Sequence, residues 1–207
     1  DPRKNLSRLI DAYSRIENSL KEKYDLVLAG NFSETETDII SDQFKKLNIS
    51  SDYIKILGYI SDSDLKYLYQ NCSLFVFPSL HEGFGLPVLE AMSCGAVVIA
   101  SNKTSVPEII GNVESLFDPY DVDDISSSIS SYLCEESLRE SSLKTSLLQV
   151  ENYSWKRSAE LTHSAFNETI KMFPEKILKS NAWEYISKRR TKHYELFVTN
   201  ISKINNS

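Results

Sequence analysis

Two glutamates, Glu82 and Glu90, frame a short loop that contains two glycines, Gly83 and Gly85. Such a loop ahead of a helix collects free backbone N–H groups at the positive end of a helix dipole, which favours a phosphate. A site for phosphate alone would avoid two nearby negative charges. A sugar phosphate would use them, because carboxylates accept hydrogen bonds from hydroxyl groups. The pattern therefore predicts a site for a nucleotide-sugar.

The flanking residues predict the elements that position this loop. The apolar run at residues 74–77 is typical of a buried strand. Pro87 is tolerated in the first turn of a helix, where its missing N–H would be unpaired. We therefore expect a strand, the glycine loop and then a helix that begins at about Leu86.

The rest of the chain repeats this alternation of strands and helices. Further strands are expected at residues 26–30, 54–58, 96–100 and 115–117. Helices are expected at residues 6–20 and 35–47, after a cap at residues 61–64 with Leu65, Leu68 and Cys72 on one face, from Pro107, after Asp121, and at residues 137–150 and 154–172. This order predicts an α/β fold with a mainly parallel sheet covered by helices on both faces. Ligands of such sheets bind at the carboxyl ends of the strands.

Composition narrows the class of protein. The chain has 207 residues, enough for one domain with a real core, and begins with Asp inside a motif, so we expect a piece of a longer protein. A net charge of −6 argues against a nucleic-acid binder. The cysteines, Cys72, Cys94 and Cys134, lack metal-like spacing, which favours reduced thiols in the cytoplasm. His163 and His193 have no acidic or thiol companions, so no metal site is expected.

Several separated motifs resemble the family 4 (group 1) retaining glycosyltransferases, in the order that this family has. Glu82 and Glu90, with seven residues between them, resemble its paired-glutamate motif. Residues 1–10, 57–62, 102–108 and 117–119 resemble other family segments. The resemblance covers about residues 1–170. It implies a Rossmann-like doubly wound parallel sheet, the C-terminal, donor-binding half of a GT-B type glycosyltransferase, whose acceptor-binding half would precede residue 1.

The resemblance implies roles for charged residues. Glu90 would bind the ribose hydroxyls of the nucleotide, and Glu82, our candidate catalytic residue, would orient the transferred sugar. Lys4 would contact the donor diphosphate, although an ordinary lysine at a helix start has the same appearance. The family's arginine a few residues earlier falls before the chain begins, and Arg3 does not occupy its position.

The resemblance also implies roles for backbone groups. The N–H groups of Phe84, Gly85 and Leu86 would contact the distal phosphate or the sugar, while Gly83 also suits a plain turn. Gly58 and Tyr59 resemble the segment whose backbone holds the base, although Tyr59 also suits an exposed surface. His81, next to Glu82, is either a ligand contact or an ordinary loop residue.

The implied activity is transfer of a hexose from GDP-mannose or a UDP-hexose to a glycan or lipid-linked acceptor, with retention of configuration. Cationic and amide groups would replace a divalent metal, and no covalent nucleophile or other cofactor is expected. We expect this chain alone to be inactive. Two alternatives stay open: a non-catalytic nucleotide-sugar-binding module of a polysaccharide assembly system, and an epimerase of the same two-domain architecture. The glutamate spacing and the glycine loop favour the transferase.

The pattern changes after residue 173. We expect residues 1–173 to form the nucleotide-sugar-binding domain and residues 174–207 to form a C-terminal helical tail. The tail carries a basic cluster of Lys188, Arg189, Arg190, Lys192 and His193. It suits packing on the protein, or a peripheral contact with anionic lipid. The expected localisation is cytoplasmic, and the alternative is the inner face of the membrane.

Overall fold

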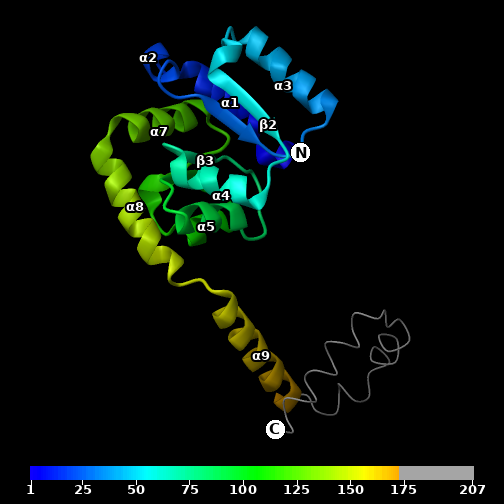
Figure 1. Ribbon diagram of the computed structural model, residues 1–207. Coiled ribbons are helices and arrows are strands. Elements are labelled where there is room, and N and C mark those ends of the chain that lie inside the picture. Colours follow the sequence, from blue (N-terminus) through cyan, green and yellow to red (C-terminus); the bar gives the residue numbers. More distant parts are fainter. Residues whose placement is uncertain (173–207) are drawn as a thin grey trace. The chain divides into compact units, whose positions relative to one another are not determined.

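The computed structural model describes residues 1–172 (Figure 1). Its contacts divide the chain into a main unit, Asp1–Asn152, and a second unit that begins at Tyr153. The expected tail and its basic cluster lie outside the described residues, so the boundary at residue 173 and the membrane contact stay predictions. Within residues 1–172, no helix is both long and apolar enough to cross a membrane.

Five strands of the main unit form two parallel sheets. β1 (Leu26–Ala29) pairs with β2 (Ile54–Gly58). β4 (Val98–Ser101) lies between β3 (Phe75–Phe77) and β5 (Leu116–Phe117). Each of these pairings is parallel, as the alternation of strands and helices predicts. The carboxyl ends of β3, β4 and β5 therefore meet at one edge.

The helices follow the predicted order. They are α1 (Leu6–Arg15), α2 (Asn18–Lys21), α3 (Glu34–Lys46), α4 (Asp62–Asn71), α5 (Leu86–Ser93), α6 (Val106–Ile110), α7 (Val122–Cys134) and α8 (Glu136–Val150), with 3₁₀ turns η1 (Pro2–Lys4), η2 (Ser51–Tyr53) and η3 (Val113–Ser115). α1 packs on α3 and α7, while α5 packs on α4, α6 and α8. These two groups flank the parallel strands of a doubly wound α/β fold (Figure 1).

Side-chain caps fix several helix starts. The Ser61 hydroxyl accepts a hydrogen bond from the Asp64 N–H at the start of α4. The Asp121 carboxylate accepts from two N–H groups at the start of α7. Such caps satisfy N–H groups that have no partner inside the helix. The sequence indicates both caps, because a short polar residue stands directly before each apolar helical pattern.

One predicted element differs from the structure. The apolar spacing across residues 6–20 predicts a single helix, but the chain breaks at Ile16, whose ψ is 157°. Ile16 and Leu20 are nevertheless buried. The helical spacing correctly predicts that these side chains are buried. A chain that turns at residue 16 buries them equally well, so the spacing does not reveal the break. The Lys21 ammonium donates to the Ser14 carbonyl at 2.8 Å, which satisfies one carbonyl near the end of α1.

The core supports the edge where the three strands end. The four residues of β4 are each 0% exposed. Ile10 of α1, Phe117 of β5 and Ile125 of α7 are buried in the same cluster as Ile99. Because close-packed interiors resist deformation, this core gives the adjoining loops a rigid base.

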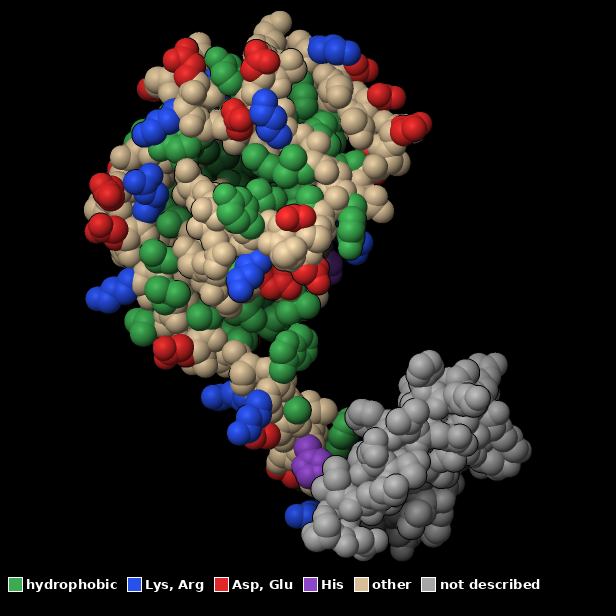
Figure 2. Space-filling model, in the orientation of Figure 1, with side chains coloured by type: hydrophobic (Ala, Val, Ile, Leu, Met, Phe, Trp, Pro, Cys, Tyr) green, Lys and Arg blue, Asp and Glu red, His purple; other side chains and the backbone are tan. Residues whose placement is uncertain are grey.

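The surface of the main unit carries both signs of charge. Figure 2 shows acidic and basic side chains intermixed on its visible face. Exposed charges are screened within about 10 Å at ordinary salt. Local pairs therefore dominate the electrostatics of this face.

The second unit contains α9 (Trp155–Met172). Large apolar side chains on this helix are exposed, namely Trp155, Leu161, Phe166, Ile170 and Met172. α9 corresponds to the helix expected at residues 154–172.

Candidate functional site

The candidate site is built around an ion pair between Lys4 and Glu82. The Lys4 ammonium donates to the Glu82 carboxylate at 2.7 Å. The same ammonium lies 5.7 Å from the centre of the Phe77 ring at the end of β3. The structure thus brings together the predicted diphosphate-binding lysine and the predicted sugar-binding glutamate.

The surroundings of Glu82 keep it ionised. Its side chain is only 17% exposed. Burial acts to raise the pKa of Glu82, but the Lys4 and Ser79 side chains and the charge of Arg3 hold it below its usual range. The Ser79 hydroxyl is close enough to favour the charged form, although it makes no hydrogen bond of full geometry among the described residues.

Lys4 is held in place by the residue that follows it. Asn5 is buried and adopts a left-handed conformation, with φ 57°. Its amide nitrogen donates to the Pro78 carbonyl at 3.1 Å and to the Pro119 carbonyl at 2.7 Å. Asn5 therefore attaches η1 to the loops that follow β3 and β5. The sequence reasoning missed this role, although Asn is a residue that tolerates positive φ.

The glycine loop ends at Gly85, which has φ 108° and precedes α5. This left-handed backbone favours glycine, and a Cβ there would lie 3.3 Å from Cδ1 of Ile109, so that side chain would have to shift slightly. A Cβ at Gly83 would meet nothing within 4 Å. Gly85 therefore has a structural role, whereas no packing contact requires Gly83.

The start of α5 lacks a side-chain cap. The N–H of its first residue, Leu86, is therefore not capped by a side chain, whereas Pro87 has no N–H and the Val88 N–H donates to the Gly85 carbonyl at 3.0 Å. Phe84 and Leu86 flank this point and are about two-fifths exposed, at 41% and 43%. Gly85, between them, is buried, and the contact of these three backbone donors with a ligand stays a prediction.

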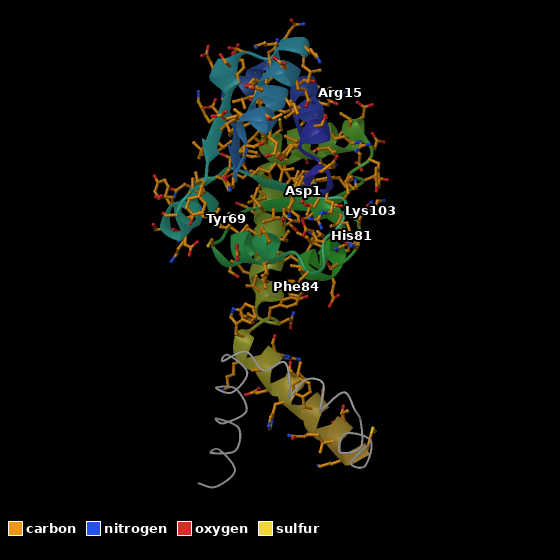
Figure 3. The ribbon with its side chains drawn as sticks, turned by 90° about the vertical axis from the view of Figure 1, so that its right-hand side faces the viewer. Asp1, Arg15, Tyr69, His81, Phe84 and Lys103 are labelled. Atoms are coloured by element: carbon orange, nitrogen blue, oxygen red, sulfur yellow. The ribbon has the colours of Figure 1, made fainter. Side chains whose placement is uncertain are left out.

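The loops after β4 and β5 are joined by Lys103 and Asp118. The Lys103 ammonium lies 3.4 Å from the Asp118 carboxylate. A hydrogen bond from the Tyr120 N–H and the Lys103 side chain lower the pKa of Asp118. Figure 3 shows Asp1, Lys103 and His81 in one region of the view and Tyr69 on the opposite side. The His81 side chain is exposed.

Glu90 lies within α5, whereas Lys4 belongs to η1 and Glu82 to the loop before α5. Glu90 is exposed, and burial first and then the charge of Glu90 raise the pKa of Tyr69 to about 12. Gly58 and Tyr59 lie at the end of β2, and the Tyr59 side chain is 82% exposed. Within residues 1–172, neither a hydrogen bond nor an ion pair joins these three residues to Lys4 or Glu82.

Comparisons with known proteins identify the family. Residues 1–145 match the family model described as glycosyl transferases group 1. The serotype-specific mannosyltransferase WbdA of Escherichia coli is 39% identical over 84% of this chain and 22% of the relative. The O-antigen chain mannosyltransferase B of Escherichia coli is 40% identical over 80% of this chain and 43% of the relative. The chain therefore belongs to the group 1 glycosyltransferases, and it spans less than half the length of these relatives.

A solved structure supports the fold. HepE from Anabaena, in complex with UDP and glucose, has a TM-score of 0.68 and 22% identity. The match covers 79% of this chain and 46% of HepE. At this identity the likeness concerns the fold alone, which is the Rossmann-like α/β fold of GT-B glycosyltransferases. The fold expected from the sequence is confirmed.

Proposed function

We propose that this chain binds the nucleotide-sugar donor of a retaining hexosyltransferase. The acceptor would be a glycan or a lipid-linked glycan, bound mainly by another part of the enzyme. The names of the relatives, two mannosyltransferases, favour mannose as the transferred hexose. GDP-mannose is therefore the first donor to test, followed by UDP-hexoses.

The observation that carries this proposal is the ion pair of Lys4 with Glu82 beside the start of α5. An ammonium group, together with the backbone N–H groups of Gly85 and Leu86 at the uncapped start of α5, suits a diphosphate. A carboxylate whose pKa is held low stays ionised near neutral pH, so it can accept hydrogen bonds from sugar hydroxyls. The diphosphate and the sugar of the donor would thus each meet complementary groups, and these groups are neighbours in the structure.

The chemistry follows from where charge develops. Glycosyl transfer passes through an oxocarbenium-like state while negative charge builds on the leaving diphosphate. Lys4, the loop N–H groups and the dipole of α5 would stabilise that charge. We assign this neutralising role to protein groups and include no metal ion. Glu82, paired with Lys4, would orient the sugar, and no residue is assigned as a covalent nucleophile.

Calorimetric titration of the chain with GDP, UDP and their sugars tests the proposal. We expect a single site, and we expect no sugar transfer by this chain alone. Lys4→Ala should lower the affinity, because a hydrogen bond to a charged group contributes about 1.5–3 kcal/mol. Arg15→Ala is the matched control, since Arg15 pairs with Asp123 away from the loop. Absence of binding to every nucleotide, or an equal loss in both variants, would contradict the proposal.

A further inference from the structure

Two side chains of the loop between β4 and α6 bond to the backbone of the glycine loop. The Thr104 hydroxyl accepts a hydrogen bond from the Glu82 N–H at 3.1 Å. The Ser105 hydroxyl lies 3.1 Å from the Glu82 carbonyl and 2.7 Å from the Phe84 carbonyl. Three backbone groups of the candidate site are therefore held by neighbouring residues of a different loop.

The Ser105 contacts set the direction of two backbone donors. In a planar trans peptide, the carbonyl and the N–H of the same unit point in opposite directions. The Glu82 and Phe84 carbonyls face Ser105, so the N–H groups of Gly83 and Gly85 point away from it. Neither of these N–H groups donates to a protein acceptor within residues 1–172.

The backbone of Thr104 provides a second, independent observation. Its φ is 55°, in the left-handed region, which a β-branched residue rarely adopts. Conformations of this kind persist only where the surrounding structure enforces them, and they gather at ligand sites. Here the unusual residue is the one whose hydroxyl binds the Glu82 N–H.

We infer that Thr104 and Ser105 are positioning residues: they hold the backbone of residues 82–85 so that the Glu82 carboxylate meets Lys4 and the Gly83 and Gly85 N–H groups face the diphosphate. The part that concerns the diphosphate rests on the proposed function. The part that concerns the placement of Glu82 does not. The neutral hydroxyls act through the backbone and need not touch the ligand.

Two substitutions remove the hydroxyls, Thr104→Val and Ser105→Ala. The first readout is the pKa of Glu82, measured by NMR titration of its side-chain carboxyl carbon. We expect this pKa to rise toward the ordinary range of a glutamate, because the pair with Lys4 loosens. The second readout is the affinity for GDP and UDP, which should fall about tenfold, equivalent to about 1.4 kcal/mol. Thr104→Ser and Ser105→Thr, which keep the hydroxyls, should restore the low pKa of Glu82.

Matched controls remove hydroxyl-to-carbonyl bonds inside helices. Ser41→Ala deletes a bond to the Thr37 carbonyl in α3, and Thr145→Val deletes a bond to the Ser141 carbonyl in α8. Both should leave the pKa of Glu82 and the nucleotide affinity unchanged.

The two parts of the inference fail in different ways. A wild-type pKa of Glu82 in folded Ser105→Ala and Thr104→Val would overturn the positioning role. If Ser105→Ala does not fold, as judged by circular dichroism, Thr104→Val decides alone. If the unmutated chain binds neither GDP nor UDP, the proposed function fails, while the Glu82 titration still decides whether Thr104 and Ser105 position that residue.

Discussion

The Lys4 ammonium lies 2.7 Å from the Glu82 carboxylate, although the two residues are 78 positions apart in the sequence. A diphosphate that approaches Lys4 competes with this carboxylate for the same three N–H donors. If the chain binds a nucleotide as proposed, this pair would couple nucleotide binding to the state of the residue that we assign to the sugar.

The first prediction separates the two glutamates through nucleotide affinity. Glu90→Ala should weaken the nucleoside diphosphate and the nucleotide-sugar alike, because both contain the ribose. Loss of a charged acceptor should cost about 1.5–3 kcal/mol. Glu82→Ala should leave the affinity for the nucleoside diphosphate unchanged or raise it slightly. The substitution removes a negative charge near the diphosphate and frees Lys4.

Calorimetry of both variants against both ligands measures this difference, with circular dichroism to confirm folding. In the full-length protein, Glu82→Ala should also depress transfer. An equal loss of bare-nucleotide affinity in Glu82→Ala and Glu90→Ala would show that the proposed division of roles is wrong.

The second prediction compares the two glycines of the site loop. Gly85→Ala should destabilise the main unit by about 1–3 kcal/mol, because a residue with a side chain is strained at φ 108° and its Cβ would crowd Ile109. Gly83→Ala is the control and should fold normally, since a Cβ there meets nothing within 4 Å. Denaturant unfolding followed by circular dichroism gives both values. Equal stability of the two variants would refute the structural role of Gly85.

The third prediction concerns Asn5. Asn5→Ala should destabilise the main unit by about 2–4 kcal/mol, because it leaves two buried carbonyl acceptors without a partner and places Ala in a left-handed conformation. Asn48→Ala is the matched control, since Asn48 also has positive φ, at 53°. It should cost only the conformational part, about 1–2 kcal/mol. Thermal or denaturant unfolding measures the loss of stability in each variant. If Asn48→Ala loses as much stability as Asn5→Ala, the role of the Asn5 side-chain hydrogen bonds is refuted.

The fourth prediction concerns alkaline pH. Burial and the nearby charge of Asp25 raise the pKa of Tyr13 from 10.0 to about 12. A raised pKa means that the folded state keeps a proton that the unfolded state loses. The stabilisation is therefore complete below pH 10 and is lost as the pH rises toward 12.

Tyr13→Phe should flatten this alkaline decline in the free energy of unfolding. The variant also loses the hydroxyl bond to the Tyr24 carbonyl, 2.8 Å in length, so its stability at neutral pH should be lower. Denaturant unfolding at several values between pH 8 and 12 provides the curve. An identical pH dependence in the two proteins would show that Tyr13 does not titrate in this way.

Much of the fold can be predicted from the sequence, because its signals are local. Apolar runs at residues 74–77 and 96–100 mark buried strands, and Ser61 and Asp121 mark helix starts. The break at Ile16 could not be predicted, because the same apolar spacing satisfies burial with or without a turn. Periodicity reports which side chains are buried, whereas continuity of a helix depends on tertiary contacts.

The candidate site could likewise be predicted from the sequence only in part. Glu82 and Lys4 were expected from the motifs, and the structure brings them together. Asn5, Thr104 and Ser105 were missed, because each acts on backbone groups that are distant in sequence. Every residue type has a backbone carbonyl. The sequence pattern therefore cannot predict which carbonyl will accept a hydrogen bond from a distant side chain.

The contacts of Asn5 also make the site depend on chain segments that are far apart in sequence. Its side chain joins carbonyls that lie 73 and 114 positions away. Long-range closures of this kind cost chain entropy and follow the formation of local structure. A growing chain that ends before Pro119 lacks one of the two carbonyls that anchor η1. The site therefore has its full set of supports only in a chain that extends through Pro119 and in which the loop after β5 has docked against η1.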